Sequence, residues 1–382
     1  MEFTLSPAQE QWRDAARCFA QQRLAPRYQA REQQGRIEPE VRLEMGEHGF
    51  IAPELPAALG GRDLDRITSG LLVEEVARGD FSVAYLQIVG SLVGQILVDN
   101  ARADVAADWV PAICRGERIV GIGLTEPHAG SDAGMPELRA RREGDEYVLN
   151  GVKSLSFCNE AAAVVVFART SEQQRRGKGI STFLVPLDSE RITRELCSDM
   201  GTKAVGRGEV HLDDVRVPAD HLLGEEGRGF TQVMRGFDFS RALIGLQCLG
   251  IAQVTVDETW QYVSRREAFD QPLSTFQGVS FPLAESETLL SAARLLCYRT
   301  LSLKDQGQPH TAEAAMCKWW APKTAFDVVQ NCLLLHGQYG YRTELPLEQR
   351  LRDVLGLQIG DGTAQIMKLV IARERVGRAL AP

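Results

Sequence analysis

The chain of 382 residues is longer than one hydrophobic core usually supports, which favours two or three domains. With 44% hydrophobic and 25% charged residues, its composition is that of a globular protein and excludes a disordered or fibrous chain. The formal net charge of −8 argues against a nucleic-acid-binding surface and repels anionic ligands at long range, so any phosphate site must be locally basic.

Cysteine usage and the first residues favour a cytoplasmic protein. The eight cysteines are scattered, without a CxxC pair or a cysteine–histidine cluster of zinc spacing, so we expect buried thiols in a reducing compartment and no metal site. The chain starts without the basic region and apolar run of a secretory signal. We also expect no apolar stretch of the about 20 residues that a membrane span needs.

Residues 1–117 are predicted to be helical. Ser6-Pro7-Ala8-Gln9 supplies an N-cap, a proline at the first helical position and a capping-box glutamine. Further stretches show apolar residues at helical spacing, and they are broken at glycine pairs and Gly-Asp steps. These stretches cover residues 39–48, 66–78 and 83–100.

The pattern changes at Arg118 to short β-branched runs separated by turns, which predicts a small antiparallel sheet in residues 118–228. The predicted strands cover residues 119–124, 146–149, 164–168, 181–185 and 209–212. Long helical patterns return at 241–265 and 278–303, so residues 229–382 are predicted to form a second helical domain. The chain is thus expected to fold as helices, then a sheet, then helices.

The most informative motif follows the first predicted strand, at residues 124–132, LTEPHAGSD. Small residues let this backbone approach a flat ring or a phosphate closely, and Thr125 and Ser131 supply short hydroxyl donors. Taken alone, the same letters are equally compatible with a plain turn between strands. Other motifs along the chain decide between the two interpretations.

Three such motifs follow the loop: Asn150-Gly151-Val152-Lys153, DDVRVP at 213–218 and GDGT at 360–363. Together they resemble the acyl-CoA dehydrogenase family over nearly the whole chain, and several motifs in register are far more specific than one glycine loop. The resemblance implies FAD-dependent α,β-dehydrogenation of an acyl-CoA thioester. It also implies an α+β fold with an N-terminal helical domain, a middle antiparallel β domain and a C-terminal four-helix bundle.

By this resemblance, Ile122, Leu124 and Thr125 edge the isoalloxazine ring of FAD, and Ser131 hydrogen-bonds near the flavin and the acyl-CoA. The family's tryptophan and threonine beside the flavin are replaced here by Leu155 and Phe157, with Ser156 between them. An aliphatic side chain is therefore expected on one face of the ring. Further expected FAD neighbours are Leu334, Gly337, Gln338, Thr363 and Gln365.

A second group of FAD contacts is implied between subunits. Arg266 matches an arginine that reaches the pyrophosphate of a neighbour's FAD, and Phe269 and Gln277 belong to the same contact region, with Gln277 near the adenine. A planar guanidinium suits a diphosphate because it offers paired donors. In isolation, Arg266 is more simply a solvated arginine at a helix end. The resemblance implies a homotetramer built as a pair of dimers.

The acyl-CoA is expected to contact five residues besides Ser131. Asp238 and Arg241 match the family's segment near the pantetheine and ribose, and Arg373 matches another coenzyme A neighbour, although unaided it is a surface charge on an amphipathic helix. Gly362 lies in the GDGT motif. Asp80 is expected in the helical pair that lines the acyl pocket, with a plain helix-end role as its alternative.

The reaction requires a carboxylate near the α-carbon, because this proton is acidic only when the enolate charge is stabilised as it forms. Most of the family has a glutamate where this chain has Asp361, and the alternative position of some members holds Ser240, which is no base. Asp361 is therefore the candidate base, against the alternative that Asp361-Gly362 is a plain turn. Aspartate is shorter by about 1.5 Å, a large difference for proton transfer.

The short base favours a compact, α-branched or alicyclic acyl group. Residues 335–341 and 348–354 resemble the branch that converts cyclohexane-1-carboxyl-CoA to cyclohex-1-ene-1-carboxyl-CoA. Two other functions stay open: a nitroalkane-oxidase-like flavin oxidase, which shares the fold and an aspartate base, and a catalytically inactive flavoprotein-like binding protein. The family resemblance implies electron-transfer flavoprotein as the electron acceptor.

Overall fold

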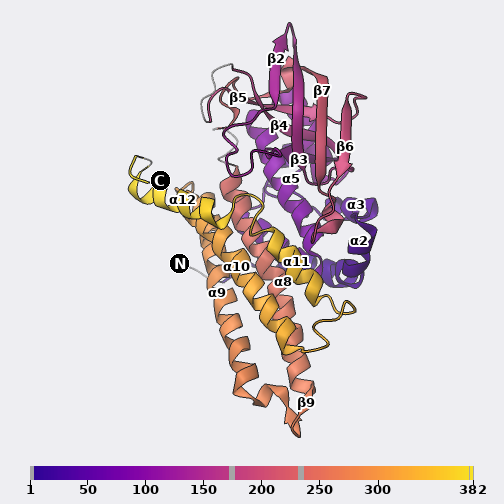
Figure 1. The fold of residues 1–382 in the computed structure, drawn as a ribbon, viewed down its shortest axis with the longest axis vertical. Coiled ribbons are helices and arrows are strands. Elements are labelled where there is room, and N and C mark those ends of the chain that lie inside the picture. Colours follow the sequence, from indigo (N-terminus) through magenta and orange to yellow (C-terminus); the bar gives the residue numbers. More distant parts are fainter. Residues whose placement is uncertain (1–3, 172–176, 231–235, 378, 382) are drawn as a thin grey trace.

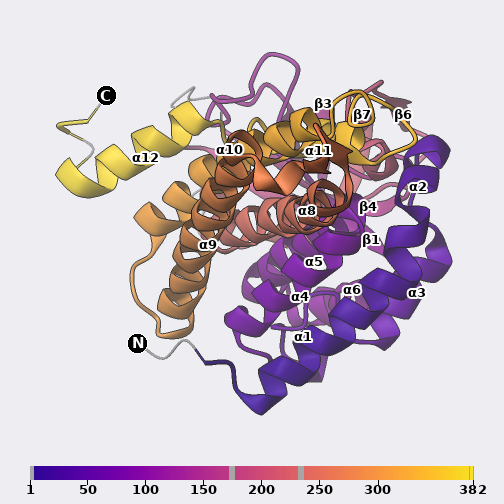
Figure 2. The ribbon, with the colours of Figure 1, turned by 90° about the horizontal axis from the view of Figure 1, so that it is seen from below.

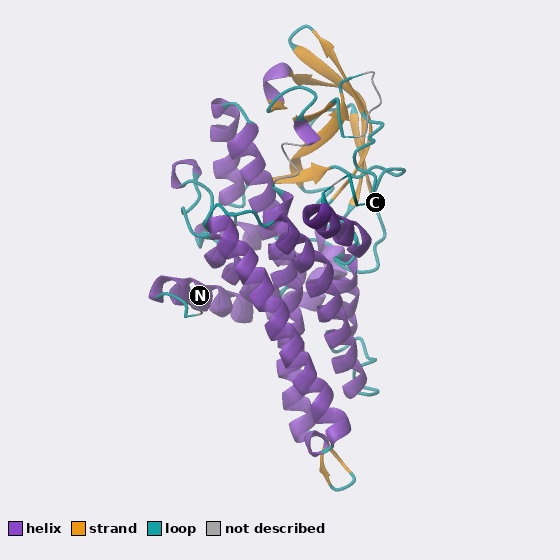
Figure 3. Cartoon of the chain, turned by 90° about the vertical axis from the view of Figure 1, so that its left-hand side faces the viewer, coloured by secondary structure: helices purple, strands orange, loops and turns teal. Residues whose placement is uncertain are grey.

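The computed structural model describes residues 4–171, 177–230, 236–377 and 379–381. Helices precede and follow a region of strands, which lies at one end of an elongated molecule (Figures 1 and 3). The predicted order of helices, sheet and helices is therefore confirmed.

The described residues of the first part form six α-helices, of which α1, α3, α4 and α5 agree with the predicted helical stretches, whereas α2 and α6 were not individually predicted. Helix α1 begins with the predicted capping box: Gln9 N donates to Ser6 Oγ at 3.2 Å, and Ser6 N donates to Gln9 Oε1 at 3.0 Å. The α-helices are α1 (Pro7–Phe19), α2 (Tyr28–Gln34), α3 (Pro39–Glu47), α4 (Arg66–Gly79), α5 (Phe81–Asn100) and α6 (Ala103–Cys114).

The middle part is one sheet in the order β6-β7-β3-β2-β4-β5-β8, with β1 paired to β4. The expectation of a purely antiparallel sheet needs a correction, because β1 runs parallel to β4, while the longer pairings, such as β3 with β7, are antiparallel. The strands are β1 (Ile119–Gly123), β2 (Arg139–Glu143), β3 (Glu146–Leu155), β4 (Ala161–Arg169), β5 (Ile180–Pro186), β6 (Ile192–Leu196), β7 (Gly208–Pro218) and β8 (Leu222–Leu223).

Three long helices dominate the last part: α8 (Phe237–Arg265), α9 (Gln277–Asp305) and α10 (Thr311–Leu335). Two short helices, α11 (Leu347–Gly356) and α12 (Ala364–Val376), also belong to this part, and both pack on α10. A small hairpin, β9 (Glu267–Ala268) with β10 (Gln271–Pro272), joins α8 to α9 at the end of the molecule opposite the sheet (Figure 1). Helix α8 also contacts α4 and α5, so it lies at the centre of the helical region (Figure 2).

Two helices correct the expectation that no apolar stretch is long enough for a membrane span. Helices α5 and α8 are long and apolar enough to cross a membrane, judged by length and composition alone. Their apolar windows are 83% and 89% buried inside the protein, so core packing accounts for their hydrophobicity.

The cysteine expectation is met in part. Six of the eight free cysteines are buried, whereas Cys18 and Cys197 are exposed. The buried thiols include Cys248, Cys297 and Cys317, one on each long helix of the C-terminal part.

Candidate active site

Asp361 lies in the loop between α11 and α12. Its backbone adopts the left-handed region, with φ 55°, and Gly362 follows at φ 103°. Aspartate tolerates this region better than most residues, and glycine adopts it freely. Thr363 then caps α12, its Oγ1 accepting from Ile366 N at 3.4 Å. The turn thus fixes the backbone that carries the candidate base, whose side chain is partly buried.

The electrostatic surroundings of Asp361 suit a base. Burial raises the pKa of Asp361, and the positive charges of Lys318 and Arg241 oppose that rise. A raised pKa makes a carboxylate a better proton acceptor, and the two cations favour its ionised form. Lys318 lies on α10 and Arg241 on α8, so two long helices direct positive charge at this loop.

Tyr85 is a site residue that the sequence interpretation missed. It lies on α5, and its ring stacks on Phe157 with centroids 6.1 Å apart. Its hydroxyl is 3.5 Å from Ser156 Oγ, which is long for such a bond. Burial and the charge of Asp361 raise the pKa of Tyr85, which links α5 electrostatically to the loop that carries Asp361. In the sequence, a tyrosine within an apolar helix looks the same whether it lies in the core or beside a functional site.

A buried ion pair anchors the loop at residues 124–132. Lys153 Nζ lies 2.7 Å from Glu126 Oε1, and both side chains are almost inaccessible. Glu126 also accepts from Glu137 N at 2.7 Å and from Leu138 N at 3.1 Å. Thr125 and Ser131 are exposed on this anchored loop, as hydroxyl donors to a ligand need to be.

The segment expected to provide an aliphatic contact for the flavin is mostly buried in this structure. Leu155 and Phe157 are each 1% exposed, since their side chains belong to the core that joins the N-terminal helices to the sheet. Of this segment, Ser156 retains partial exposure. Ile122 and Leu124 are also partly exposed, so these three residues present more surface to a ring than Leu155 or Phe157.

Asp238 and Arg241 are brought together on the first turn of α8 and are largely buried. Arg241 Nη1 donates to Asp238 Oδ1 at 2.8 Å, and Thr311 Oγ1 donates to Asp238 Oδ2 at 2.6 Å. The positive charge of Arg241 also acts on Asp361, and the expected contact of this pair with coenzyme A stays a prediction. Arg373 lies on α12, where it is partly buried.

Asp80 is a helix cap in this structure and not a wall of an open pocket. Its Oδ1 accepts from Ser82 N and Val83 N at the start of α5, at 2.9 and 3.1 Å. Its Oδ2 pairs with Arg31 Nη1 at 2.8 Å, and both side chains are 1% exposed. The geometry therefore supports the helix-end alternative.

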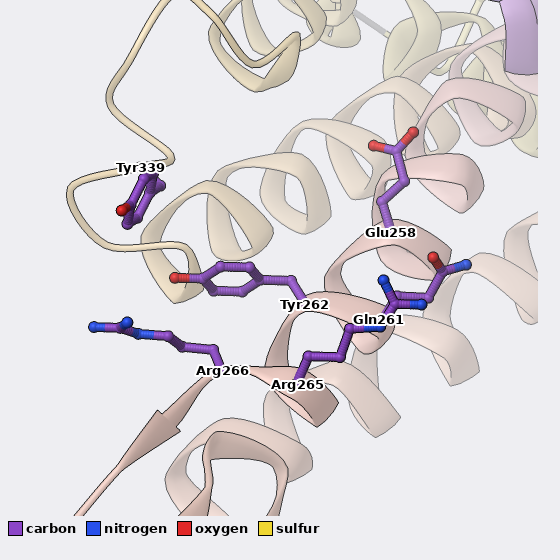
Figure 4. Close-up of a pocket in the computed structure, with 6 residues that line it drawn as sticks. All are labelled: Glu258, Gln261, Tyr262, Arg265, Arg266 and Tyr339. Atoms are coloured by element: carbon purple, nitrogen blue, oxygen red, sulfur yellow. The ribbon is translucent and has the colours of Figure 1, made fainter.

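A shallow hollow of about 460 Å³ lies at the far end of α8. It is lined by Glu258, Gln261, Tyr262, Arg265, Arg266 and Tyr339. The side chains of Tyr262 and Arg266 extend from α8 towards the loop that carries Tyr339 (Figure 4). Exposed guanidinium groups beside aromatic rings are the donor set that a nucleotide diphosphate requires, so these residues fit that part of FAD.

The other expected FAD neighbours separate into two groups. Phe269, Gln277, Leu334, Gly337 and Gln338 are exposed and lie on or beside the segments that frame this hollow. Gln365, with Gly362 and Thr363, lies near Asp361 instead. Arg241 and Arg266 are 25 positions apart on one helix, about 38 Å along its axis. One chain therefore carries two separate groups of candidate residues.

Comparison with known proteins identifies the family. The models of the acyl-CoA dehydrogenase N-terminal, middle and C-terminal domains match residues 6–117, 121–215 and 227–375. The mitochondrial short-chain specific acyl-CoA dehydrogenase of Rattus norvegicus is 36% identical over 364 residues, covering 94% of this chain and 88% of the rat protein. The cyclohexane-1-carbonyl-CoA dehydrogenase of Geobacter metallireducens is 35% identical over 366 residues, covering 94% of this chain and 95% of that protein.

A solved structure described as the electron transferring flavoprotein of Acidaminococcus fermentans contains a chain that superposes with a TM-score of 0.95. The two chains are 32% identical, and the match covers 98% of this chain and 100% of that one. The three matched domain models and the relatives define an acyl-CoA dehydrogenase. The chain belongs to the acyl-CoA dehydrogenase family, whose members are FAD-dependent oxidoreductases acting on CH–CH bonds.

Proposed function

We propose that this protein dehydrogenates a compact α-branched or alicyclic acyl-CoA, with cyclohexane-1-carboxyl-CoA as the model substrate and Asp361 as the base. The observation that carries the proposal is the Asp361 carboxylate, on which the charges of Lys318 and Arg241 act and whose own charge acts on Tyr85. The similarity to a cyclohexane-1-carbonyl-CoA dehydrogenase supports the substrate class. The similarity to a short-chain enzyme makes straight short chains the main competitor.

In the proposed mechanism, the Asp361 carboxylate takes the α-proton, and its own backbone N–H helps to hold the thioester carbonyl. Lys318 and Arg241 favour the ionised carboxylate before the proton arrives. Thr125 and Ser131 orient the reactants with their hydroxyl groups. FAD, when bound, supplies the acceptor for the hydride that leaves the β-carbon.

The shape of the site supports a compact acyl group for two reasons. The aspartate is about 1.5 Å shorter than the family's usual glutamate, so the α-carbon must approach this backbone closely. Tyr85 of α5 is close enough to Asp361 to feel its charge, and its ring stacks on Phe157, so we infer that it limits the room for a longer chain on this side of the base. A compact ring beside this aromatic side chain fits the arrangement better than an extended chain.

We also propose that two subunits share each FAD site in a homotetramer built from two dimers. The hollow at Arg266 lies about 38 Å along α8 from the Arg241 end, too far for both ends to serve one cofactor in the same chain. Phe269 is 89% exposed at the tip of the hairpin, as expected for an apolar contact with a partner. Sizing of the holoenzyme tests this assembly, and a strictly monomeric holoenzyme contradicts it.

The electron acceptor is proposed to be electron-transfer flavoprotein, and the location the cytoplasm. The similarity to a chain from the Acidaminococcus electron transferring flavoprotein structure supports the acceptor. Stoichiometric peroxide formation at the rate of substrate loss contradicts this electron acceptor and favours a nitroalkane-oxidase-like oxidase.

We further propose domains of residues 1–117, 118–228 and 229–382, because the secondary structure changes class between α6 and β1 and between β8 and α8.

Anaerobic titration of the bound flavin with a panel of acyl-CoAs tests the proposed substrate. We expect cyclohexane-1-carboxyl-CoA to bleach the flavin fastest, followed by α-branched short chains. Preference for straight butyryl-CoA contradicts the substrate class and leaves the family activity intact. A purified protein that neither contains nor binds FAD supports the inactive binding-protein alternative.

A further inference from the structure

Lys318 is a completely buried lysine whose ammonium group contacts the loop of residues 357–363, which carries Asp361. Its exposed fraction is 0%, and Nζ donates to the carbonyl oxygens of Leu357 at 2.6 Å and Gly362 at 3.1 Å. A buried ammonium is costly unless its protons are hydrogen-bonded and its charge is balanced. The two carbonyls satisfy protons but carry no net charge. The balancing charge must come from another group.

Asp361 is the group that supplies the counter-charge. The titratable and charged groups that act on Lys318 are Asp361, from the loop before α12, and Cys248 and Arg241, both from α8. Arg241 is a second cation and cannot balance the charge of Lys318. The Asp238 carboxylate is already hydrogen-bonded to Arg241 and Thr311. Burial lowers the pKa of Lys318 to about 8, with Asp361 opposing that decrease, so the lysine is largely charged at neutral pH.

The two residues whose carbonyl oxygens accept from Lys318 lie on either side of Asp361 in the sequence. Leu357 lies four positions before Asp361, at the end of α11, and Gly362 follows it directly. One side chain therefore holds both ends of the short segment that carries the base. An apolar residue of similar size fills such a space without the cost of burying a charge, so packing alone does not account for a lysine here.

We propose that Lys318 is a positioning residue, which fixes the loop of residues 357–363 and keeps the Asp361 carboxylate ionised and aimed at the substrate. This inference rests on the proposed role of Asp361 as the base. Lys318 contacts backbone oxygens of the loop and acts on the reaction through Asp361.

The first test compares the pH dependence of flavin reduction in the holoenzyme with that of Lys318→Met and Lys318→Gln. Loss of a cation near a carboxylate raises its pKa by about 1 unit or more, so the acid limb of the profile moves to higher pH by that amount in both variants. Lys318→Gln keeps a donor for the loop, so its plateau rate exceeds that of Lys318→Met. Acid limbs that stay within about 0.2 pH units of the wild type in folded variants overturn the proposal.

Val329→Ala serves as the matched control. Val329 is another fully buried residue of α10, about three turns from Lys318, and lies outside the candidate site. Its truncation lowers stability without removing a charge. Its acid limb is expected to match that of the wild type, and a shift equal to that of the Lys318 variants overturns the electrostatic role of Lys318.

The second test requires no lysine variant and no activity. Asp361→Asn leaves Lys318 without its counter-charge, so the Tm of the variant at neutral pH falls below that of the wild type. The difference between the two Tm values narrows above about pH 8, because Lys318 loses its proton there. A gap that is absent or independent of pH overturns the pairing. Full-speed flavin reduction in Asp361→Asn refutes the base itself, whereas slow reduction without the Tm gap refutes only the role of Lys318.

Discussion

The hydroxyl of Tyr28 donates a hydrogen bond of 2.6 Å to Asp353 Oδ2, which joins α2 to α11 across 325 positions of sequence. The other carboxylate oxygen of Asp353 accepts from Thr202 N at 2.5 Å, in the loop between β6 and β7. Asp353 is 1% exposed. One carboxylate therefore connects the first helices, the sheet region and the last helices.

This carboxylate is expected to make stability depend on pH. Burial raises the pKa of Asp353 to about 7 in the folded protein, from an unfolded value near 3.8. Between these values the folded protein binds more protons than the unfolded chain, so the contribution of Asp353 to the free energy of unfolding falls as pH rises from about 4 to about 7. Asp353→Asn keeps an acceptor for Thr202 and removes this fall. Parallel Tm-against-pH curves for the two proteins contradict the expectation.

Asp80→Asn is expected to destabilise the protein without slowing the chemical step. The change breaks a buried ion pair with Arg31 and weakens the cap of α5, and such losses cost about 3–5 kcal/mol. Chemical denaturation measures the loss, and single-turnover flavin reduction with the FAD-loaded variant measures the chemistry. A reduction rate lowered about 100-fold in folded protein shows that Asp80 takes part in catalysis after all.

Tyr85 is expected to set the size of the acyl group. Tyr85→Ala opens space beside Asp361, so the ratio of kcat/KM for cyclohexane-1-carboxyl-CoA to that for hexanoyl-CoA falls about tenfold or more, the effect of roughly 1–3 kcal/mol of lost contact. Tyr85→Phe keeps the ring and is the matched control, with a ratio close to that of the wild type. An unchanged ratio in Tyr85→Ala places Tyr85 outside the acyl pocket.

Arg266→Ala is expected to weaken FAD binding about tenfold or more, because hydrogen bonds to charged groups contribute about 1.5–3 kcal/mol each. The control is Arg299→Ala, which removes an arginine of α9 that pairs with Glu313 at 3.2 Å. FAD content after gel filtration measures the effect. Equal FAD retention in both variants contradicts the assignment of the hollow.

The sequence predicted those elements whose own residues carry a periodic pattern. The capping box of Ser6 and Gln9 and the apolar spacing of α5 gave helices close to the observed bounds. Strands β2 and β6 were missed because their sequences, RARRE and ITREL, are mostly polar and their side chains largely exposed. The parallel pairing of β1 with β4 depends on a long-range contact that no local pattern specifies.

The candidate site was predictable where a motif marked it, as at Asp361 and the loop of residues 124–132. The burial of Leu155 and Phe157 was not predictable, and their expected contact with the flavin stays a prediction. The roles of Tyr85 and Lys318 were missed for a related reason. A single tyrosine or lysine in a helix indicates nothing about its contacts until other helices pack around it.

The most direct test of the account is the rate of anaerobic flavin reduction by cyclohexane-1-carboxyl-CoA in Asp361→Asn and Asp361→Glu. Asparagine keeps the size and polarity of the side chain but cannot accept the proton, so the rate falls by about 10² to 10⁴ while FAD and acyl-CoA still bind. Glutamate keeps the base but crowds the α-carbon, so it slows the ring substrate and spares straight chains. Full-speed flavin reduction in Asp361→Asn contradicts the assignment of the base.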